Sequence, residues 1–359
     1  MKHHSLEFHP TFARSTFARC GRLKKNLALL FALNAFLTVV ILTGCKGQKP
    51  VSDTHNGIDS TRICAVKFCA DSAFRFVQDQ CEFGPRVPNS KAWEQCGDYI
   101  AAKFESYGLK VTNQRTTLKA WDDQSLKCRN IIAAYRPELT ERVILCAHYD
   151  SRPWADNDEN PENHHSPVMA ANDGASGVAV MMEIARNIEK LSPKVGVDFI
   201  CFDLEDYGAP EWASEEVQNM GDTWCMGSKY WSENPHTEGY AARYGILLDM
   251  VGGRGSVFAH EGFSLKYAQS IVVRTWEAAR YAGAEAVFPQ KAGGYITDDH
   301  VPMNEIAMIP TIDIIPFYED GDNTFGPHWH TTHDVVENID PQVLRAVGQT
   351  VMQLLSEEE

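Results

Sequence analysis

The chain has 359 residues, 44% hydrophobic and 23% charged, which suits one large α/β domain or two small ones. The formal net charge is −15 at pH 7, which argues against a nucleic-acid-binding protein and against a surface for anionic lipid. Composition alone identifies no substrate.

The N-terminal segment has the composition of an export signal. An apolar run over 26–42 follows four basic residues, Arg19, Arg22, Lys24 and Lys25. Basic, apolar and small segments in this order are typical of a secretory signal peptide. The ending Leu42-Thr43-Gly44-Cys45 also resembles the bacterial lipobox, which implies cleavage before Cys45 and lipidation of its thiol. An uncleaved membrane anchor is the alternative, because about 17 apolar residues approach the shortest length that spans a bilayer.

We therefore interpret residues 1–44 as a lipoprotein signal peptide, 45–60 as a flexible tether and 61–359 as a single domain. Under either alternative the domain lies outside the cytoplasm, facing the periplasm of the bacterial cell envelope and held at a membrane through Cys45. No domain-sized linker follows residue 60, although the size would also allow two domains. We expect a monomer.

Eight cysteines follow Cys45, and an exported chain permits disulfides. Cys146 and Cys201 stand inside apolar runs and are expected to pack as small hydrophobic residues. Cys64 and Cys69 are close enough to pair, but the sequence leaves the connectivity open. The absence of a Cys-x-x-Cys motif argues against a thiolate metal site.

The spacing of apolar residues predicts strands that alternate with helices. In chain order we expect helices over 70–83 and 89–107, strands over 109–119, 129–135 and 142–147, a helix over 175–190, a strand over 197–202, a short helical or irregular stretch over 228–232, a strand over 243–248, a helix over 265–282, a strand over 311–315 and a helix over 341–355. This pattern predicts an α/β fold, with a central mixed, mostly parallel sheet flanked by helices on both faces.

Acidic residues gather where the predicted strand 197–202 ends. Asp203, Glu205 and Asp206 place three carboxylates within four residues, where they repel one another beside a buried strand. The carboxyl ends of strands in open α/β sheets are where ligands bind. The alternative is a solvated turn in which Asp206 caps a helix.

Other strand ends and loops carry similar side chains. His148 and Asp150 follow one strand, Asp249 ends another, and Asp173 stands where the helix 175–190 opens. Each has an ordinary explanation, such as a core histidine or a helix cap. Together with Asp298 and His330, they form a mixed Asp/Glu/His set without cysteine, which is typical of a catalytic zinc site.

Five motifs in this order resemble the series of the zinc aminopeptidase and glutaminyl cyclase superfamily. They are His148-Tyr149-Asp150-Ser151, Asn172-Asp173-Gly174, Glu205-Asp206, Leu248-Asp249 and Trp329-His330-Thr331. The resemblance covers about residues 65–357 and implies an α/β sandwich with the fold of the zinc exopeptidases.

Two classes of enzyme share these ligands. Di-zinc aminopeptidases would use five positions, which this chain could fill with His148, Asp173, Asp206, Asp249 and His330. Glutaminyl cyclases bind a single zinc ion. The segment 298–302, Asp-Asp-His-Val-Pro, is similar to a cyclase motif, and so are Trp329 before His330 and Trp212 after the acidic pair.

The chain departs from the animal cyclases in three features, one of which is that Gly174 and Gly177 keep the glycines of the aminopeptidases. Asp206 replaces the usual second glutamate, and Asp313 stands where animal cyclases carry a histidine. These departures favour a bacterial glutaminyl cyclase, which cyclises the N-terminal glutamine of peptides to pyroglutamate with release of ammonia.

The resemblance implies a role for each site residue. One Zn²⁺ would be held by Asp173, Asp206 and His330. Glu205 would transfer the proton, Asp249 would orient the amine, Asp298 would hydrogen-bond to Asp249, and Trp329 and Trp212 would wall the substrate pocket. The alternative, an aminopeptidase with two zinc ions, would place the second metal on His148 and Asp249. A third interpretation, a non-catalytic solute-binding lipoprotein, conflicts with the intact set of acids.

Overall fold

The computed structural model describes residues 58–220, 223–319 and 323–359, which belong to one compact unit, Thr54–Glu359. The predicted signal peptide, Cys45 and most of the tether lie outside the described residues. Within them, no helix has the length and apolar character needed to cross a membrane.

Helices and strands alternate through most of the described chain. The strands are β1 Lys110–Lys119, β2 Ser125–Tyr135, β3 Arg142–His148, β4 Gly196–Phe202, β5 Tyr244–Leu248 and β6 Thr311–Ile314. The helices are α1 Ala70–Cys81, α2 Lys91–Ser106, α3 Ala175–Leu191, α4 Glu215–Gln218, α5 Met226–Glu233, α6 Gly262–Tyr281, α7 His300–Glu305 and α8 Pro341–Ser356. Three short 3₁₀ turns complete the described part: Ser60–Arg62, Pro161–Asn163 and Val336–Asn338.

The described strands form one mixed sheet in the order β1-β2-β4-β3-β5-β6. β1 and β2 form an antiparallel hairpin, and β2 is also antiparallel to β4. β4, β3, β5 and β6 run parallel to their neighbours. The predicted α/β fold with a mixed, mostly parallel sheet is confirmed.

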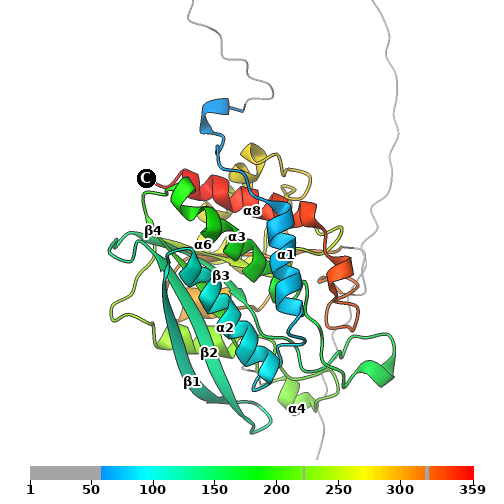
Figure 1. Ribbon diagram of the computed structural model, residues 1–359. Helices are drawn as coiled ribbons and strands as arrows, with labels where there is room; N and C mark the ends of the chain where they lie inside the picture. The colour runs from blue at the N-terminus through cyan, green and yellow to red at the C-terminus, as the bar shows by residue number, and fades with distance from the viewer. Residues whose placement is uncertain (1–57, 221–222, 320–322) are drawn as a thin grey trace, which may run out of the picture. The chain divides into compact units, whose positions relative to one another are not determined.

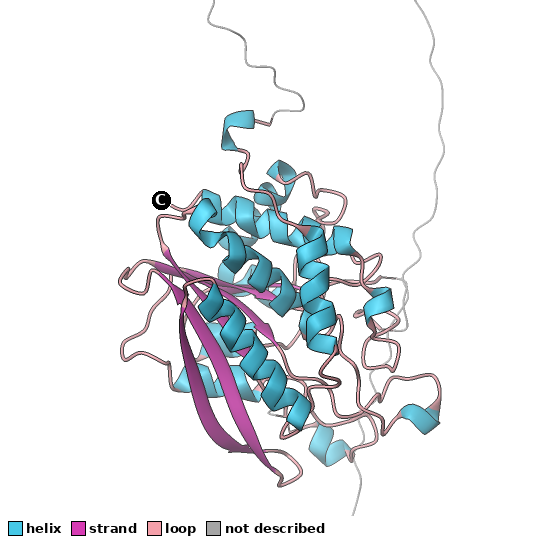
Figure 2. Cartoon of the chain, in the orientation of Figure 1, coloured by secondary structure: helices cyan, strands magenta, loops and turns pink. Residues whose placement is uncertain are grey.

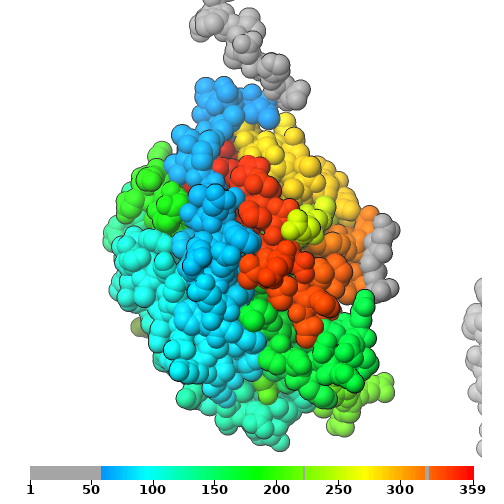
Figure 3. Space-filling view, turned by 45° about the vertical axis from the view of Figure 1, so that its right-hand side comes forward, coloured from blue at the N-terminus to red at the C-terminus, as the bar shows by residue number. Residues whose placement is uncertain are grey.

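Helices cover both faces of the sheet because side chains alternate along each strand. In β3, Val143, Leu145 and Ala147 pack into the larger core with α1, α2, α3, α6 and α8. Ile144 and Cys146 face the other side, in a smaller core with Trp231 of α5 and Met303 of α7. Figures 1 and 2 show the helices of the larger core in front of the strands. Figure 3 shows α8, in red, on the surface beside α1, in blue.

Two boundaries differ from the predicted ones for local reasons. β2 begins at Ser125, four residues before the predicted start at 129. Its first residues are mostly polar, but they pair with β1 as far as the Lys119–Ser125 pair. The hairpin, and not an apolar run, therefore defines where this strand begins. α6 begins at Gly262, where the Glu261 carboxylate accepts hydrogen bonds from the backbone N–H groups of Phe263 and Ser264.

Gly177 lets α3 pack against the end of β5. A Cβ atom at this position would lie 2.0 Å from the carbonyl oxygen of Leu248 and 2.8 Å from the Ala147 methyl group.

We therefore expect Gly177→Ala to lower the free energy of unfolding by about 3 kcal/mol or more, because neither backbone can move aside without displacing the sheet. Urea unfolding would measure the effect. Gly294→Ala is the matched control, since its nearest neighbour would lie at 3.4 Å, and equal stability of the two variants would contradict the packing argument.

Candidate metal centre and active site

The topology brings the predicted site residues to one edge of the sheet. His148 is the last residue of β3, Asp249 directly follows β5, and Glu205 and Asp206 follow β4. These three strands are parallel neighbours, so their carboxyl ends meet at the same edge. Asp173 approaches the same edge from the loop before α3.

Two clusters of possible metal ligands share the Asp173 carboxylate. In one, His330 Nε2 lies 3.2 Å from Asp206 Oδ1 and 3.6 Å from Asp173 Oδ2. This cluster contains the three residues predicted to hold zinc. In the other, His148 Nε2 lies 2.9 Å from Asp173 Oδ1 and 3.2 Å from Asp249 Oδ1. The second cluster contains the residues of the predicted alternative metal.

The first cluster fits a divalent cation. Asp206 Oδ2 is buried and has no hydrogen-bond partner among the described residues. Burial and the neighbouring Asp173 raise the pKa of Asp206 well above its ordinary value, so a bound cation would stabilise the ionised form of this carboxylate. Donor atoms of Asp173, Asp206 and His330 all lie within 4.8 Å of one another. Carboxylate oxygens and imidazole nitrogens are zinc ligands, and catalytic zinc sites have three protein ligands and one open position.

Buried polar groups orient the ligands of this cluster from behind. The second ring nitrogen of His330, Nδ1, lies 3.5 Å from Asp156 Oδ1, as in many carboxylate–histidine–metal arrangements. Arg152 pairs with Asp156 and donates to both the backbone and the carboxylate of Asp206. Neither Asp156 nor Arg152 stood out in the sequence, because each is one polar residue in a loop.

The loops that carry the ligands are also fixed by buried side chains. Asp150 accepts hydrogen bonds from the backbone N–H groups of Glu205 and Asp206. Asp334 holds the backbone of Asn172 and Asp173 in the same way. Asp150, one of the acids predicted to follow a strand, therefore positions the acidic turn that carries Glu205 and Asp206.

Strained backbone concentrates around this site. Five non-glycine residues of the site or next to it in sequence adopt a left-handed conformation, with φ between 49° and 57°. They are Ala170, Leu204, Cys225, Met250 and His330. This conformation costs free energy for residues other than glycine and is often found where function requires an exact placement.

A cavity of about 200 Å³ opens onto the acidic cluster. Its apolar walls are formed by six residues: Trp224, Met250, Ile296, Ile315, Phe325 and Trp329. Its polar lining includes Asp173, Glu205, Asp249, Asp298 and His330. Trp329 stacks on His330 with ring centroids 3.8 Å apart, as expected for a pocket wall beside the ligand.

Trp212 does not line this cavity. Its side chain is 45% exposed and packs against Trp154 and His165 instead. Trp224 takes the predicted place, stacked over His330 at 5.9 Å with the Arg152 guanidinium on its ring. The distance of each tryptophan from Glu205 along the sequence does not reveal which of the two lines the cavity.

Three acids in the cavity have raised pKa values. Burial raises the pKa of Glu205 well above its ordinary value, and it raises that of Asp249 to about 6. Burial and repulsion by Asp249 raise the pKa of Asp298 to about 7. The expected hydrogen bond between Asp298 and Asp249 is not found among the described residues; Asp298 Oδ1 instead accepts from the backbone N–H of Asp299.

The fold and site therefore define a metal-site α/β protein of the exopeptidase type. The profile of peptidase family M28 matches residues 130–355, and the chain belongs to this family.

Solved structures from bacteria are similar over nearly their whole length. The chain is 50% identical to a glutaminyl cyclase of Bacteroides thetaiotaomicron solved with N-acetylhistamine, with a TM-score of 0.80 and coverage of 82% of this chain and 99% of that one. It is 49% identical to a leucine aminopeptidase precursor of the same organism, with a TM-score of 0.79 and coverage of 83% and 100%. These two similar proteins are named for different activities, one as a cyclase and the other as an aminopeptidase.

Curated relatives are more distant. The glutaminyl-peptide cyclotransferase of Gloydius blomhoffii is 24% identical over 237 residues, which cover 59% of this chain and 60% of that protein. The chain spans between a third and about three fifths of the length of the curated relatives it matches.

Proposed function

We propose that the protein is a zinc-dependent glutaminyl cyclase, which converts the N-terminal glutamine of peptides to pyroglutamate and releases ammonia. The observation that carries the proposal is the small, largely apolar cavity in which Glu205 stands beside the Asp173–Asp206–His330 cluster. A flat five-membered lactam needs such an aromatic slot. The similarity to a bacterial glutaminyl cyclase at 50% identity supports the same activity.

The metal would be held by Asp173, Asp206 and His330. Zinc bound there would supply Lewis acidity next to the γ-carboxamide of the substrate. The stacking of Trp329 on His330 and the buried Asp156 hold the imidazole in place.

Glu205 carries the proton in this mechanism. As the α-amino nitrogen attacks the carbonyl carbon of the side-chain carboxamide, the Glu205 carboxylate accepts one proton from that nitrogen. It returns the proton to the amide nitrogen as the carbon–nitrogen bond breaks, and ammonia leaves. The raised pKa of Glu205 lets this carboxylate both accept and release a proton near neutral pH.

The remaining polar and aromatic residues orient the substrate. Asp249 would accept a hydrogen bond from the α-amino group, and Asp298 lies in the same lining. Trp224 and Trp329 would enclose the forming ring and exclude water, which protects the reaction from hydrolysis.

A di-zinc aminopeptidase is the second candidate. It is favoured by the intact second cluster, in which His148 and Asp249 converge on Asp173. In that case Glu205 would accept a proton from water instead of from the α-amine.

One incubation separates the two activities. A peptide with N-terminal glutamine is treated with the zinc-loaded protein and the product is weighed by mass spectrometry. Loss of one ammonia with the peptide chain intact supports the cyclase. Release of free glutamine supports the aminopeptidase and overturns the proposal. The zinc content of the purified protein gives an independent measure, one ion or two.

Cys225 positions the proton carrier. Its thiol lies 3.5 Å from Glu205 Oε1, and its backbone N–H donates to the Glu205 carbonyl oxygen. Burial raises the pKa of the thiol well above its ordinary value, so it remains a protonated donor. We expect Cys225→Ala to lower kcat about 2–10-fold with KM little changed, the effect of losing one hydrogen bond.

Cys225→Ser is the matched variant, because its hydroxyl group keeps the donor. Steady-state kinetics on a glutaminyl peptide would test the pair. If alanine and serine at 225 reduce kcat equally, the thiol acts only through packing.

We also propose that the enzyme is an exported lipoprotein, monomeric and held at a membrane through Cys45. The proposal is supported by the basic and apolar N-terminal segments and by the Leu-Thr-Gly-Cys ending. We expect Cys45→Ala to move the protein from the membrane fraction to the soluble or unprocessed fraction of bacterial cells, measured by fractionation and immunoblotting. Unchanged membrane association and processing would contradict it.

A further inference from the structure

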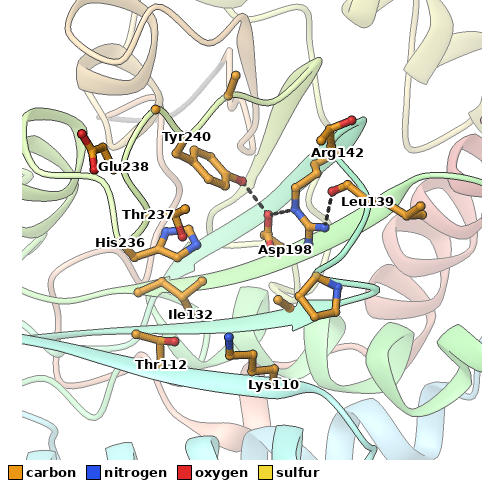
Figure 4. A pocket seen from close by; sticks show the side chains of 15 residues that line it. Lys110, Thr112, Ile132, Leu139, Arg142, Asp198, His236, Thr237, Glu238 and Tyr240 are labelled. Atoms are coloured by element: carbon orange, nitrogen blue, oxygen red, sulfur yellow. Dashed lines mark hydrogen bonds and ion pairs between the residues drawn. The ribbon is translucent and has the colours of Figure 1, made fainter.

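A second cavity, of about 470 Å³, lies at the opposite end of the strands from the metal cluster. It is lined by β1 and β2, by the start of β3 and β4, and by the loop between α5 and β5 (Figure 4). Arg142 at its floor and His148 at the metal cluster are the two ends of β3. A strand of this length spans about 20 Å, so the cavity is separate from the active site.

The floor of the cavity is a neutral ion pair whose hydrogen bonds are already used. The Arg142 guanidinium donates to both oxygens of Asp198 at 2.6 Å, and its other N–H groups bind backbone carbonyl groups. The Tyr240 hydroxyl donates to the same carboxylate at 2.6 Å. Figure 4 shows Asp198 between Tyr240 and Arg142, and the contact of Arg142 with Leu139. Arg142 and Asp198 therefore have few hydrogen bonds left for a ligand. They form a rigid base of the cavity instead.

Two donors on the walls are unused. Lys110 is exposed, and none of the described residues forms an ion pair or hydrogen bond with its ammonium group. His236 Nδ1 accepts a hydrogen bond from the indole N–H of Trp231 at 3.2 Å. An indole nitrogen can only donate, so the proton of the neutral imidazole is on Nε2, which has no partner among the described residues.

The rest of the wall combines apolar side chains with the hydroxyl groups of Thr112, Thr140 and Thr237. Ile132, Ala134 and Leu139 line one side, and the Tyr240 ring packs against His236 at 4.7 Å. Cross-strand pairing places Lys110 beside Ala134 and Thr112 beside Ile132, so the cation stands next to apolar side chains. The carboxylate of Glu238, which also belongs to the lining, points away from the Lys110 ammonium group in Figure 4.

We infer that this cavity is a binding site for a small organic carboxylate with an apolar body. The carboxylate is held by the Lys110 ammonium and His236 Nε2–H, and the body lies against Ile132, Ala134 and Leu139. An organic cation is disfavoured because the buried acid of the cavity, Asp198, is already saturated by three donors. The volume exceeds that of the catalytic cavity and suits a ligand of about ten to fifteen non-hydrogen atoms.

Isothermal titration calorimetry with phenylpropionate tests the site on the zinc-loaded protein. Phenylpropanol and phenylpropylamine replace the carboxylate by a neutral and a cationic group. We expect saturable binding of phenylpropionate with one site per chain. The affinity should fall about tenfold or more for Lys110→Met, which loses a charged hydrogen bond but keeps an unbranched apolar side chain. Ala134→Phe, which fills the cavity, should abolish binding.

Lys127→Met on β2 is the matched control, because it removes an exposed lysine near the far end of the same hairpin. It should bind phenylpropionate like the unmodified protein, and the cyclisation rate of Lys110→Met should be unchanged. The inference is overturned if phenylpropionate shows no saturable binding, if the alcohol or the amine binds equally well, or if Lys110→Met binds as tightly as Lys127→Met.

Discussion

Replacing Glu205 by Gln is expected to lower kcat for cyclisation by about 10²–10⁴-fold, the usual contribution of a positioned proton carrier. The amide has nearly the same shape as the carboxylate but cannot take the proton from the attacking nitrogen. Because Glu205 belongs to the cavity lining and is not in the Asp173–Asp206–His330 cluster, zinc content should stay unchanged.

Rates measured on a glutaminyl peptide, with zinc analysis and thermal unfolding of each variant, would test this expectation. Glu215→Gln on α4 is the control, since it removes an exposed carboxylate from the same region of the chain. A Glu205→Gln variant with full activity would exclude Glu205 as the proton carrier in both the cyclase and the aminopeptidase mechanisms.

Replacing Asp206 by Asn is expected to remove most of the bound zinc and to lower kcat/KM by about 10³-fold or more, equivalent to several kcal/mol of lost charge stabilisation. The same change should stabilise the metal-free protein, because it removes a buried carboxylate that Asp173 repels. Zinc should therefore raise the Tm of the unmodified protein but not that of the variant.

Metal analysis and thermal scans with and without zinc would measure both effects. Asp206→Glu introduces the longer acid that the animal cyclases carry at this position, and it should retain zinc. Glu159→Gln is the control, because it removes an exposed acid from a nearby loop. Full zinc content in Asp206→Asn would place the metal on the other cluster, that of His148, Asp173 and Asp249.

The sequence alone determined the fold class and the set of acids and histidines at the sheet edge. Apolar runs mark the strands, and a polar residue directly after a buried run marks His148, Glu205 and Asp249. The order of the motifs adds Asp173, Asp298 and His330 to the set. The bounds of β3 and β4 were predicted within a residue because those strands are buried on both faces.

Only the tertiary structure decided which contacts hold these residues together. Asp173 connects two clusters because α3 begins where the ends of β3 and β5 meet. Trp224 rather than Trp212 lines the cavity, and Asp156 and Arg152 contact His330 and Asp206 across long distances in sequence. The second cavity is formed by segments more than a hundred residues apart, Lys110 and His236 among them. Such contacts depend on the packing of loops, which local periodicity and spacing do not encode.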